Sequence, residues 1–204
     1  AVGIGQIAPD ERDVMAASST GIADLVRDAL DAGATRLIVG LGGSATTDGG
    51  AGLLAGLDAR WLGPDGAELE PTPDALRALD RVDLSGLEPR LAGVTIDLAC
   101  DVTNPLLGPS GSAAVFGPQK GASPDQVPVL DGVLGRIADA LVAAAAPEVR
   151  DRPGAGAAGG LGAAFLALGA EMRRGVEVVA DAAGLDDAVA GADLVLTGEG
   201  SIDS

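Results

Sequence analysis

The stretch from Leu37 to Gly50 constrains the fold of this chain more than any other. Residues 37–39 are Leu-Ile-Val, and they run into Gly-Leu-Gly-Gly-Ser-Ala-Thr-Thr-Asp-Gly-Gly before an apolar run that begins at Ala51. This order predicts a buried strand, a tight glycine loop and a helix. Such a loop directs backbone N–H groups and a helix N-terminus at one point, which suits an anion or a phosphate. The alternative is a plain strand-to-helix connection that binds nothing.

Helical and extended patterns alternate along the chain, which predicts an α/β fold. Apolar residues at 22, 25, 26, 29 and 30 have helical spacing, and Gly33 is placed to end that helix. Two further apolar runs, Val94–Cys100 and Asp193–Thr197, predict strands. We therefore expect a layered sheet with flanking helices and with glycine-rich loops at the carboxyl ends of its strands. Further helices are expected over residues 51–57, 112–116, 123–146, 163–168, 176–183 and 186–190.

Residues 59–92 are expected to lie outside this sheet. Pro64-Asp65-Gly66 has the composition of a tight turn and predicts a hairpin over residues 59–69. Residues 71–92 are short, acidic and interrupted by prolines, which predicts a surface connection with a helical turn or two. Together these patterns describe residues 1–204 as a single α/β domain.

Missing residue types narrow the chemistry that this chain can perform. The sequence has no histidine, so Ser-His-Asp catalysis, Cys-His catalysis and histidine metal sites are excluded within it. Cys100 is the only cysteine, which excludes an intrachain disulfide and a Cys-x-x-Cys site. We interpret Cys100 as a buried small residue at the end of a strand rather than as a nucleophile.

The net charge of −17 opposes binding to nucleic acid or to an anionic membrane. No uncharged apolar run is long enough to span a bilayer, and we expect a cytoplasmic protein. An anionic substrate would need a local positive charge in so acidic a chain. Lys120, the only lysine, lies between glycines in a loop and is the one ammonium group available for it.

Carboxylates follow each of the three expected strands: Asp48, Asp101, and the pair Glu199 and Asp203. If the strands are parallel neighbours, these carboxylates meet at one edge of the sheet. Acidic oxygens beside glycine-rich anion cradles suit Mg²⁺–nucleotide chemistry, and a carboxylate could also activate an attacking hydroxyl. For each acid the alternative is a helix cap or a loop hydrogen bond.

Two glycine motifs resemble a dinucleotide-binding fingerprint. Residues 40–45 fit G-x-G-x-x-A, with Asp58 near the expected acidic position. Residues 154–159 fit G-x-G-x-x-G, but they follow Arg152-Pro153 rather than a strand. An NAD(P)-dependent oxidoreductase therefore stays open as an alternative, as does a non-catalytic scaffold domain.

Five blocks in order resemble the bacterial type I glycerate kinases. They are residues 40–52 (GLGGSATTDGGAG), 99–106 (ACDVTNPL), 108–122 (GPSGSAAVFGPQKGA), 153–164 (PGAGAAGGLGAA) and 197–203 (TGEGSID). The resemblance implies ATP- and Mg²⁺-dependent phosphorylation of D-glycerate, usually to 2-phosphoglycerate and otherwise to 3-phosphoglycerate. It also implies a two-domain enzyme with the active site between its domains, of which this chain is a central fragment that we expect to be inactive alone.

The resemblance also suggests roles for individual residues. Thr47 and Ser201 depart from its pattern, since relatives often carry Asn and Arg there. Oligomeric state is left open. The assigned residues are Gly42, Gly43, Ser44 and Thr46 as an anion cradle, Asp48 and Asp203 for hydroxyl activation, Lys120 and Asn104 for the carboxylate or phosphoryl group, Asp101 and Gly198 as further substrate or phosphate contacts, and Glu199 with Asp203 for the metal.

Overall fold

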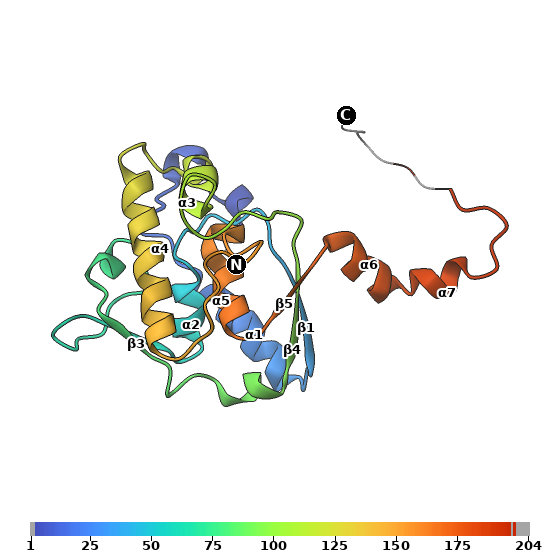
Figure 1. The fold of residues 1–204 in the computed structure, drawn as a ribbon, viewed down its shortest axis with the longest axis horizontal. Coiled ribbons are helices and arrows are strands. Elements are labelled where there is room, and N and C mark those ends of the chain that lie inside the picture. The colour runs from blue at the N-terminus through green and yellow to red at the C-terminus, as the bar shows by residue number, and fades with distance from the viewer. Residues whose placement is uncertain (1–2, 197, 199–204) are drawn as a thin grey trace.

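A parallel sheet flanked by helices forms the body of the protein, as the α/β prediction requires (Figure 1). The structure is a computed structural model that describes residues 3–196 and 198. Its three-stranded sheet has the order β1 (Arg36–Gly40), β4 (Thr95–Ala99) and β5 (Glu171–Arg173). Both pairings are parallel, so the carboxyl ends of the three strands lie at one edge.

The predicted helices form close to their expected bounds, except that the helix expected over residues 163–168 lies within a longer α5, whose residues 158–160 have left-handed backbone. Within the described residues, no helix is both long enough and apolar enough to cross a membrane. Beyond β5, α6 and α7 extend away from the body (Figure 1). The helices and helical turns are η1 (Ile4–Gln6), η2 (Pro9–Glu11), α1 (Gly21–Asp31), α2 (Ala51–Gly56), η3 (Ala75–Ala78), η4 (Pro89–Gly93), α3 (Ser112–Phe116), η5 (Pro118–Lys120), α4 (Gln126–Ala143), α5 (Ala157–Ala167), α6 (Gly175–Ala183) and α7 (Leu185–Val189).

The segment expected as a surface connection contains a strand. β2 (Arg60–Leu62) pairs antiparallel with β3 (Arg81–Asp83), with Trp61 opposite Val82. The predicted turn does form, since Gly63 N–H donates to the Ala67 carbonyl at 2.9 Å. The hairpin over residues 59–69, however, closes with only a single bridge between Leu62 and Glu68. The main partner of β2 is β3, whose Val82 is buried in the core opposite Trp61.

The third strand of the sheet is β5 and not the predicted Asp193–Thr197. Met172 is half-buried and pairs with Leu98 of β4. Within the described residues, 193–196 form no strand, and Leu194, Val195 and Leu196 are 75%, 57% and 86% exposed. An apolar run forms a strand only by pairing with a partner, and residues 193–196 pair with neither edge strand of this sheet, β1 or β5.

The core is built almost entirely from aliphatic side chains. Trp61 and Phe165 are its buried aromatic members, each 1% exposed. The indole N–H of Trp61 donates to the Ala51 carbonyl at 2.9 Å, which ties β2 to the first turn of α2. α2 is itself buried from Ala51 to Leu54, so the helix that follows the glycine loop is anchored in the core.

Candidate functional site

The glycine loop leaves the carboxyl end of β1 with an exposed tip and a buried base. Gly42 and Gly43 are exposed, whereas Ser44 and Thr46 are only 5% and 2% exposed. The N-terminal segment holds the loop from one side, since Ile4 N–H donates to the Gly43 carbonyl at 2.7 Å. None of the described residues accepts a hydrogen bond from the Gly42 N–H. The tip therefore has backbone donors available to an anion.

Lys120 packs against the base of this loop. η5 carries it there, and its side chain is 2% exposed. The ammonium group donates to Ser44 Oγ at 2.9 Å and to the Thr46 carbonyl at 2.6 Å, both neutral acceptors. Burial lowers the pKa of Lys120 to about 8, although the negative charge of Asp48 partly opposes this. The loop and the only lysine of the chain are thus brought together, from residues more than 70 positions apart.

A pocket of about 190 Å³ opens beside this lysine. Its polar lining comes from Gly42, Gly43, Ser44, Gln119 and Lys120. No described residue that lines it carries a carboxylate. We call it the Lys120 pocket; its remaining lining residues, which sequence reasoning did not single out, are Leu41, Val102, Phe116 and Ala158.

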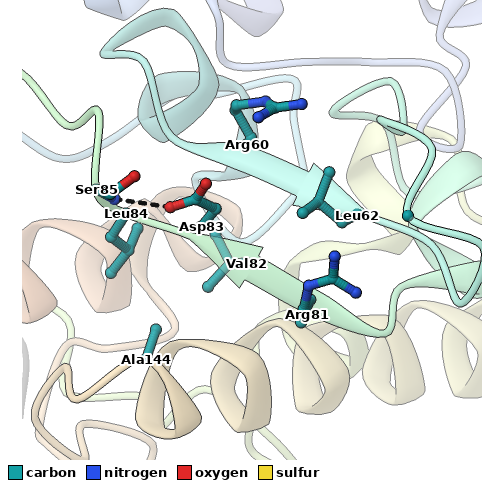
Figure 2. Close-up of a pocket in the computed structure, with 9 residues that line it drawn as sticks. Arg60, Leu62, Arg81, Val82, Asp83, Leu84, Ser85 and Ala144 are labelled. Carbon is teal, nitrogen blue, oxygen red and sulfur yellow. Dashed lines mark hydrogen bonds between the residues drawn. The ribbon is translucent and has the colours of Figure 1, made fainter.

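A larger and more open pocket, of about 770 Å³, lies against β2 and β3 (Figure 2). Its two arginines already have partners, since Arg60 lies 3.1 Å from Glu68 and Arg81 lies 3.6 Å from Asp80. Both are more than half exposed. None of the residues predicted for a site lines this pocket, and it is an ordinary charged surface.

Asp48 is fully buried, and its hydrogen bonds hold the glycine loop in place. Its carboxylate accepts hydrogen bonds from Ser19 N–H and Ser19 Oγ, each at 2.7 Å, and from Gly50 N–H and Gly52 N–H, each at 3.1 Å. Burial raises the pKa of Asp48, and these hydrogen bonds oppose the rise. The side chain does not line the Lys120 pocket. This geometry matches the loop-hydrogen-bond alternative, and the catalytic role of Asp48 stays a prediction.

Asp101 and Asn104 follow β4 but are used in local contacts. Asp101 Oδ1 accepts a hydrogen bond from Gly175 N–H at 2.9 Å, at the start of α6. Asn104 Nδ2 donates to the Ser110 carbonyl at 2.8 Å. Neither lines the Lys120 pocket, whereas Val102, which lies between them in sequence, does. Over residues 3–196 and 198, the potential metal-ligating side chains form no cluster that could hold an ion.

The predicted residues of the last block can be placed only in part. Gly198 is exposed and belongs to no helix or strand. Glu199 and Asp203 lie outside the described residues. Their roles as metal ligands, and that of Asp203 in hydroxyl activation, therefore stay predictions.

The second glycine cluster supports the first loop through backbone contacts. Gly159 has a φ of +76°, and its carbonyl accepts a hydrogen bond from Gly49 N–H at 2.9 Å. A Cβ at Gly159 would lie 1.9 Å from the Thr46 carbonyl oxygen. Ala158, which lines the Lys120 pocket, shares this left-handed conformation with a φ of +51°. The cluster that fits G-x-G-x-x-G is thus a packing surface for the loop at 46–50.

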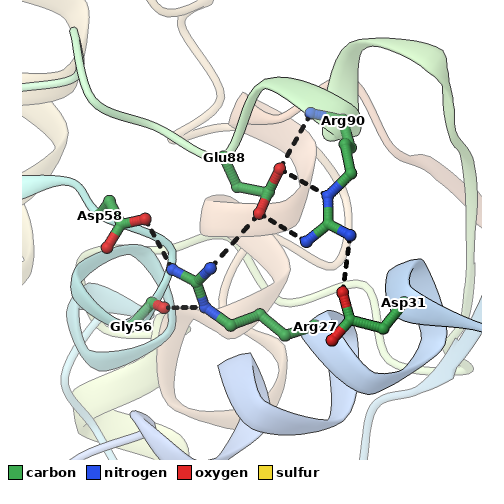
Figure 3. Close-up of polar contacts among 6 residues, drawn as sticks. All are labelled: Arg27, Asp31, Gly56, Asp58, Glu88 and Arg90. Atoms are coloured by element: carbon green, nitrogen blue, oxygen red, sulfur yellow. Dashed lines mark hydrogen bonds and ion pairs between the residues drawn. The ribbon is translucent and has the colours of Figure 1, made fainter.

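Asp58, the acidic residue of the dinucleotide alternative, is part of an ion-pair network (Figure 3). Its carboxylate lies 2.7 Å from the Arg27 guanidinium, which also contacts Glu88 at 3.3 Å. Arg90 joins the same network, 2.9 Å from Glu88 and 2.7 Å from Asp31. These contacts hold α1 against the segments that follow α2 and precede β4, so Asp58 has a structural use that explains its presence.

The chain is similar to known proteins along its whole length. A family model described as the glycerate kinase family matches residues 1–204. The chain is 48% identical over 205 residues to the glycerate kinase of Bacillus subtilis (strain 168), and 45% identical over 205 residues to the glycerate 2-kinase of Escherichia coli (strain K12). In both comparisons the match covers 100% of this chain and 54% of the relative.

A solved structure gives the same result for the fold. It is from Salmonella typhimurium LT2 and is described as a glycerate kinase 2, and it matches with a TM-score of 0.94 at 48% identity. The match covers 100% of this chain and 55% of that one. The chain thus spans about half the length of the relatives it matches. Because the family model and these relatives match it over its whole length, this chain belongs to the glycerate kinase family.

Proposed function

We propose that the intact protein transfers the γ-phosphoryl group of ATP to a hydroxyl of D-glycerate, giving 2-phosphoglycerate or 3-phosphoglycerate. In this step a bond forms between the hydroxyl oxygen and the γ-phosphorus, and the bond from that phosphorus to the β–γ bridging oxygen breaks. The hydroxyl proton passes to a base, and ADP leaves. Membership of the glycerate kinase family supports this proposal.

One observation in this chain carries the proposal furthest: a buried lysine beside an exposed glycine tip. Lys120 is held by Ser44 and Thr46, and the pocket it lines has backbone N–H groups and no described carboxylate. Both substrates are anions, and phosphoryl transfer depends mainly on positioning and on electrostatic stabilisation. In a chain with a net charge of −17, this pocket is suited to an anion.

The carboxylates have separate roles in this proposal. Asp203 takes the proton from the attacking hydroxyl, since it stands in the TGEGSID block that resembles the family. Asp48 holds the loop in place through its hydrogen bonds with Ser19, Gly50 and Gly52. Asp101 and Asn104 are proposed to contact substrate through atoms that their hydrogen bonds with Gly175 and Ser110 do not use, namely the second carboxylate oxygen of Asp101 and the amide oxygen of Asn104.

Mg²⁺ is the cofactor that we propose, and it would neutralise charge on the ATP phosphates. Carboxylate oxygens are the protein ligands that this ion prefers. The described residues of the Lys120 pocket offer none, so they do not fit the ion. We assign it to Glu199 and Asp203.

The test is ³¹P NMR of the intact protein with ATP, Mg²⁺ and D-glycerate. A new phosphomonoester resonance is expected. Splitting by one proton would identify the C2 ester, and splitting by two protons would identify the C3 ester. In the same assay Asp203→Asn should lower kcat far more than it weakens ATP binding.

A folded, intact protein that produces no phosphomonoester would contradict the proposal. An NAD(P) titration would then test the oxidoreductase alternative, and absence of binding by any of these ligands would favour a scaffold. The chain alone, without the rest of the enzyme, is expected to give no turnover. Turnover by residues 1–204 alone would contradict the two-domain arrangement.

A further inference from the structure

The Lys120 pocket is small for the substrates of a kinase. Its volume of about 190 Å³ corresponds to about six water molecules, at about 30 Å³ each. Pockets for drug-sized ligands measure about 300–1,000 Å³. A three-carbon acid fits within this space, whereas a whole nucleoside triphosphate would extend beyond it.

The lining of the pocket matches the two ends of such an acid. Lys120 and the exposed glycine tip both line the pocket, and an ammonium group with backbone N–H groups is suited to hold a carboxylate. Val102 and Phe116 supply apolar surface, which offers no partner for the charged phosphates of a nucleotide. A carboxylate carries one negative charge, and Lys120 is the one cationic side chain among the described lining residues.

We propose that the Lys120 pocket binds the carboxylate end of the three-carbon acid, with Phe116 limiting the length of the acid, and that the nucleotide lies outside this pocket. The inference rests on the proposed function, since it assigns one of the two substrates to this chain. Lys120 contacts the carboxylate together with the Gly42 and Gly43 N–H groups. Phe116 is the specificity-determining wall.

The nucleotide must then bind elsewhere on the intact protein. The larger pocket at β2 and β3 is open, and its arginines are paired with acids. This larger pocket supplies a residue for a matched control variant. Arg81→Met removes one positive charge from a pocket that the proposal does not use (Figure 2).

The test is to measure two dissociation constants by calorimetry on the intact protein. The first is for D-glycerate, with and without a non-hydrolysable ATP analogue, and the second is for ATP with Mg²⁺. Lys120→Met should weaken D-glycerate binding by about 10- to 100-fold, the range expected for loss of a hydrogen bond between charged groups. ATP binding should change by less than about threefold, and Arg81→Met should leave both constants unchanged.

Phe116→Ala provides a second test that does not disturb the buried lysine. It should raise kcat/KM for a four-carbon 2,3-dihydroxy acid relative to glycerate by about tenfold or more, since a methylene that no longer clashes changes discrimination by that amount. The far-ultraviolet circular dichroism of each variant checks that it is folded. An unchanged preference in folded Phe116→Ala would overturn the role of Phe116.

The inference and the proposed function fail in different ways. If Lys120→Met weakens ATP binding and leaves D-glycerate binding unchanged, the pocket belongs to the nucleotide. The inference would then be wrong while the kinase activity stands. If the wild-type protein does not phosphorylate D-glycerate at all, the proposed function fails, and the assignment of the pocket fails with it.

Discussion

Replacing Gly159 with alanine would test whether the two glycine clusters must interlock. The φ of +76° at this position strains any residue with a Cβ. The added Cβ would also lie 1.9 Å from the Thr46 carbonyl oxygen and 2.7 Å from the Thr46 carbonyl carbon. These neighbours are backbone atoms, so the contact can be relieved only if the loop at 46–50 moves away from α5.

The expected cost combines three effects. Left-handed backbone costs about 1–2 kcal/mol, and overpacking in a well-packed region costs about 1–3 kcal/mol. Separation of the two clusters also weakens the buried hydrogen bond from Gly49 N–H to the Gly159 carbonyl, at about 1–3 kcal/mol. We expect the free energy of unfolding to fall by about 3–8 kcal/mol, a large part of the roughly 5–15 kcal/mol of a typical domain.

Urea unfolding of the intact protein, followed by far-ultraviolet circular dichroism, measures this loss. Gly169→Ala is the matched control, since Gly169 follows α5 with a φ of +87° and has no atom within 4 Å of an added Cβ. It should cost only the backbone strain, about 1–2 kcal/mol. The difference between the two variants isolates the steric contact with Thr46.

The reasoning would be refuted if Gly159→Ala were no less stable than Gly169→Ala. A functional effect should accompany the loss of stability, because the Thr46 carbonyl that the new Cβ displaces also accepts a hydrogen bond from Lys120. Binding of D-glycerate should therefore weaken in Gly159→Ala and stay unchanged in Gly169→Ala.

Three further predictions concern buried or paired charges. Asp48→Asn should lower the free energy of unfolding by about 2–5 kcal/mol in urea titrations, because an amide cannot accept hydrogen bonds from all four N–H and O–H donors. Asp28 is exposed, so the control variant Asp28→Asn should be near neutral. An equal effect of the two substitutions would contradict the role of Asp48 as loop anchor. The pKa of Lys120 in the folded protein is about 8, below its ordinary value of 10.5, so between these pH values the unfolded chain binds one more proton than the folded protein. The free energy of unfolding should therefore rise with pH across that window. Lys120→Met should flatten this rise, and an unchanged slope would contradict the burial of the lysine. Hydrogen bonds from Arg90 lower the pKa of Glu88 to about 2. The stabilising effect of ionised Glu88 is therefore complete above its ordinary pKa of 4.5 and is lost as the pH falls toward 2. Glu88→Gln should reduce the slope of acid unfolding, whereas a slope equal to that of the wild type would contradict this ion-pair network.

Local patterns were sufficient for much of the fold. The order of strand, glycine loop and helix over residues 37–56 is as predicted, because it depends on adjacent residues. The prediction that this strand is buried was wrong, since no residue of β1 is buried and Ile38 is 50% exposed. Helical periodicity gave α1, and α3 and α4 were also expected close to their observed bounds. β5 could not be predicted, since Glu-Met-Arg has neither length nor alternation and becomes a strand only by pairing with β4.

For the candidate site, too, some features follow from the sequence and others only from the tertiary structure. Sequence alone identified the residues with suitable chemistry, among them the glycine tip, Asp48 and Lys120. Tertiary structure decided which of them meet: it buried Asp48 against Ser19, placed Lys120 on Ser44 and Thr46, and used Gly159 to support the loop. The reason is physical. Residue type and local spacing fix what a side chain can do, whereas burial, pKa and hydrogen-bond partners depend on segments brought together only when the whole chain packs.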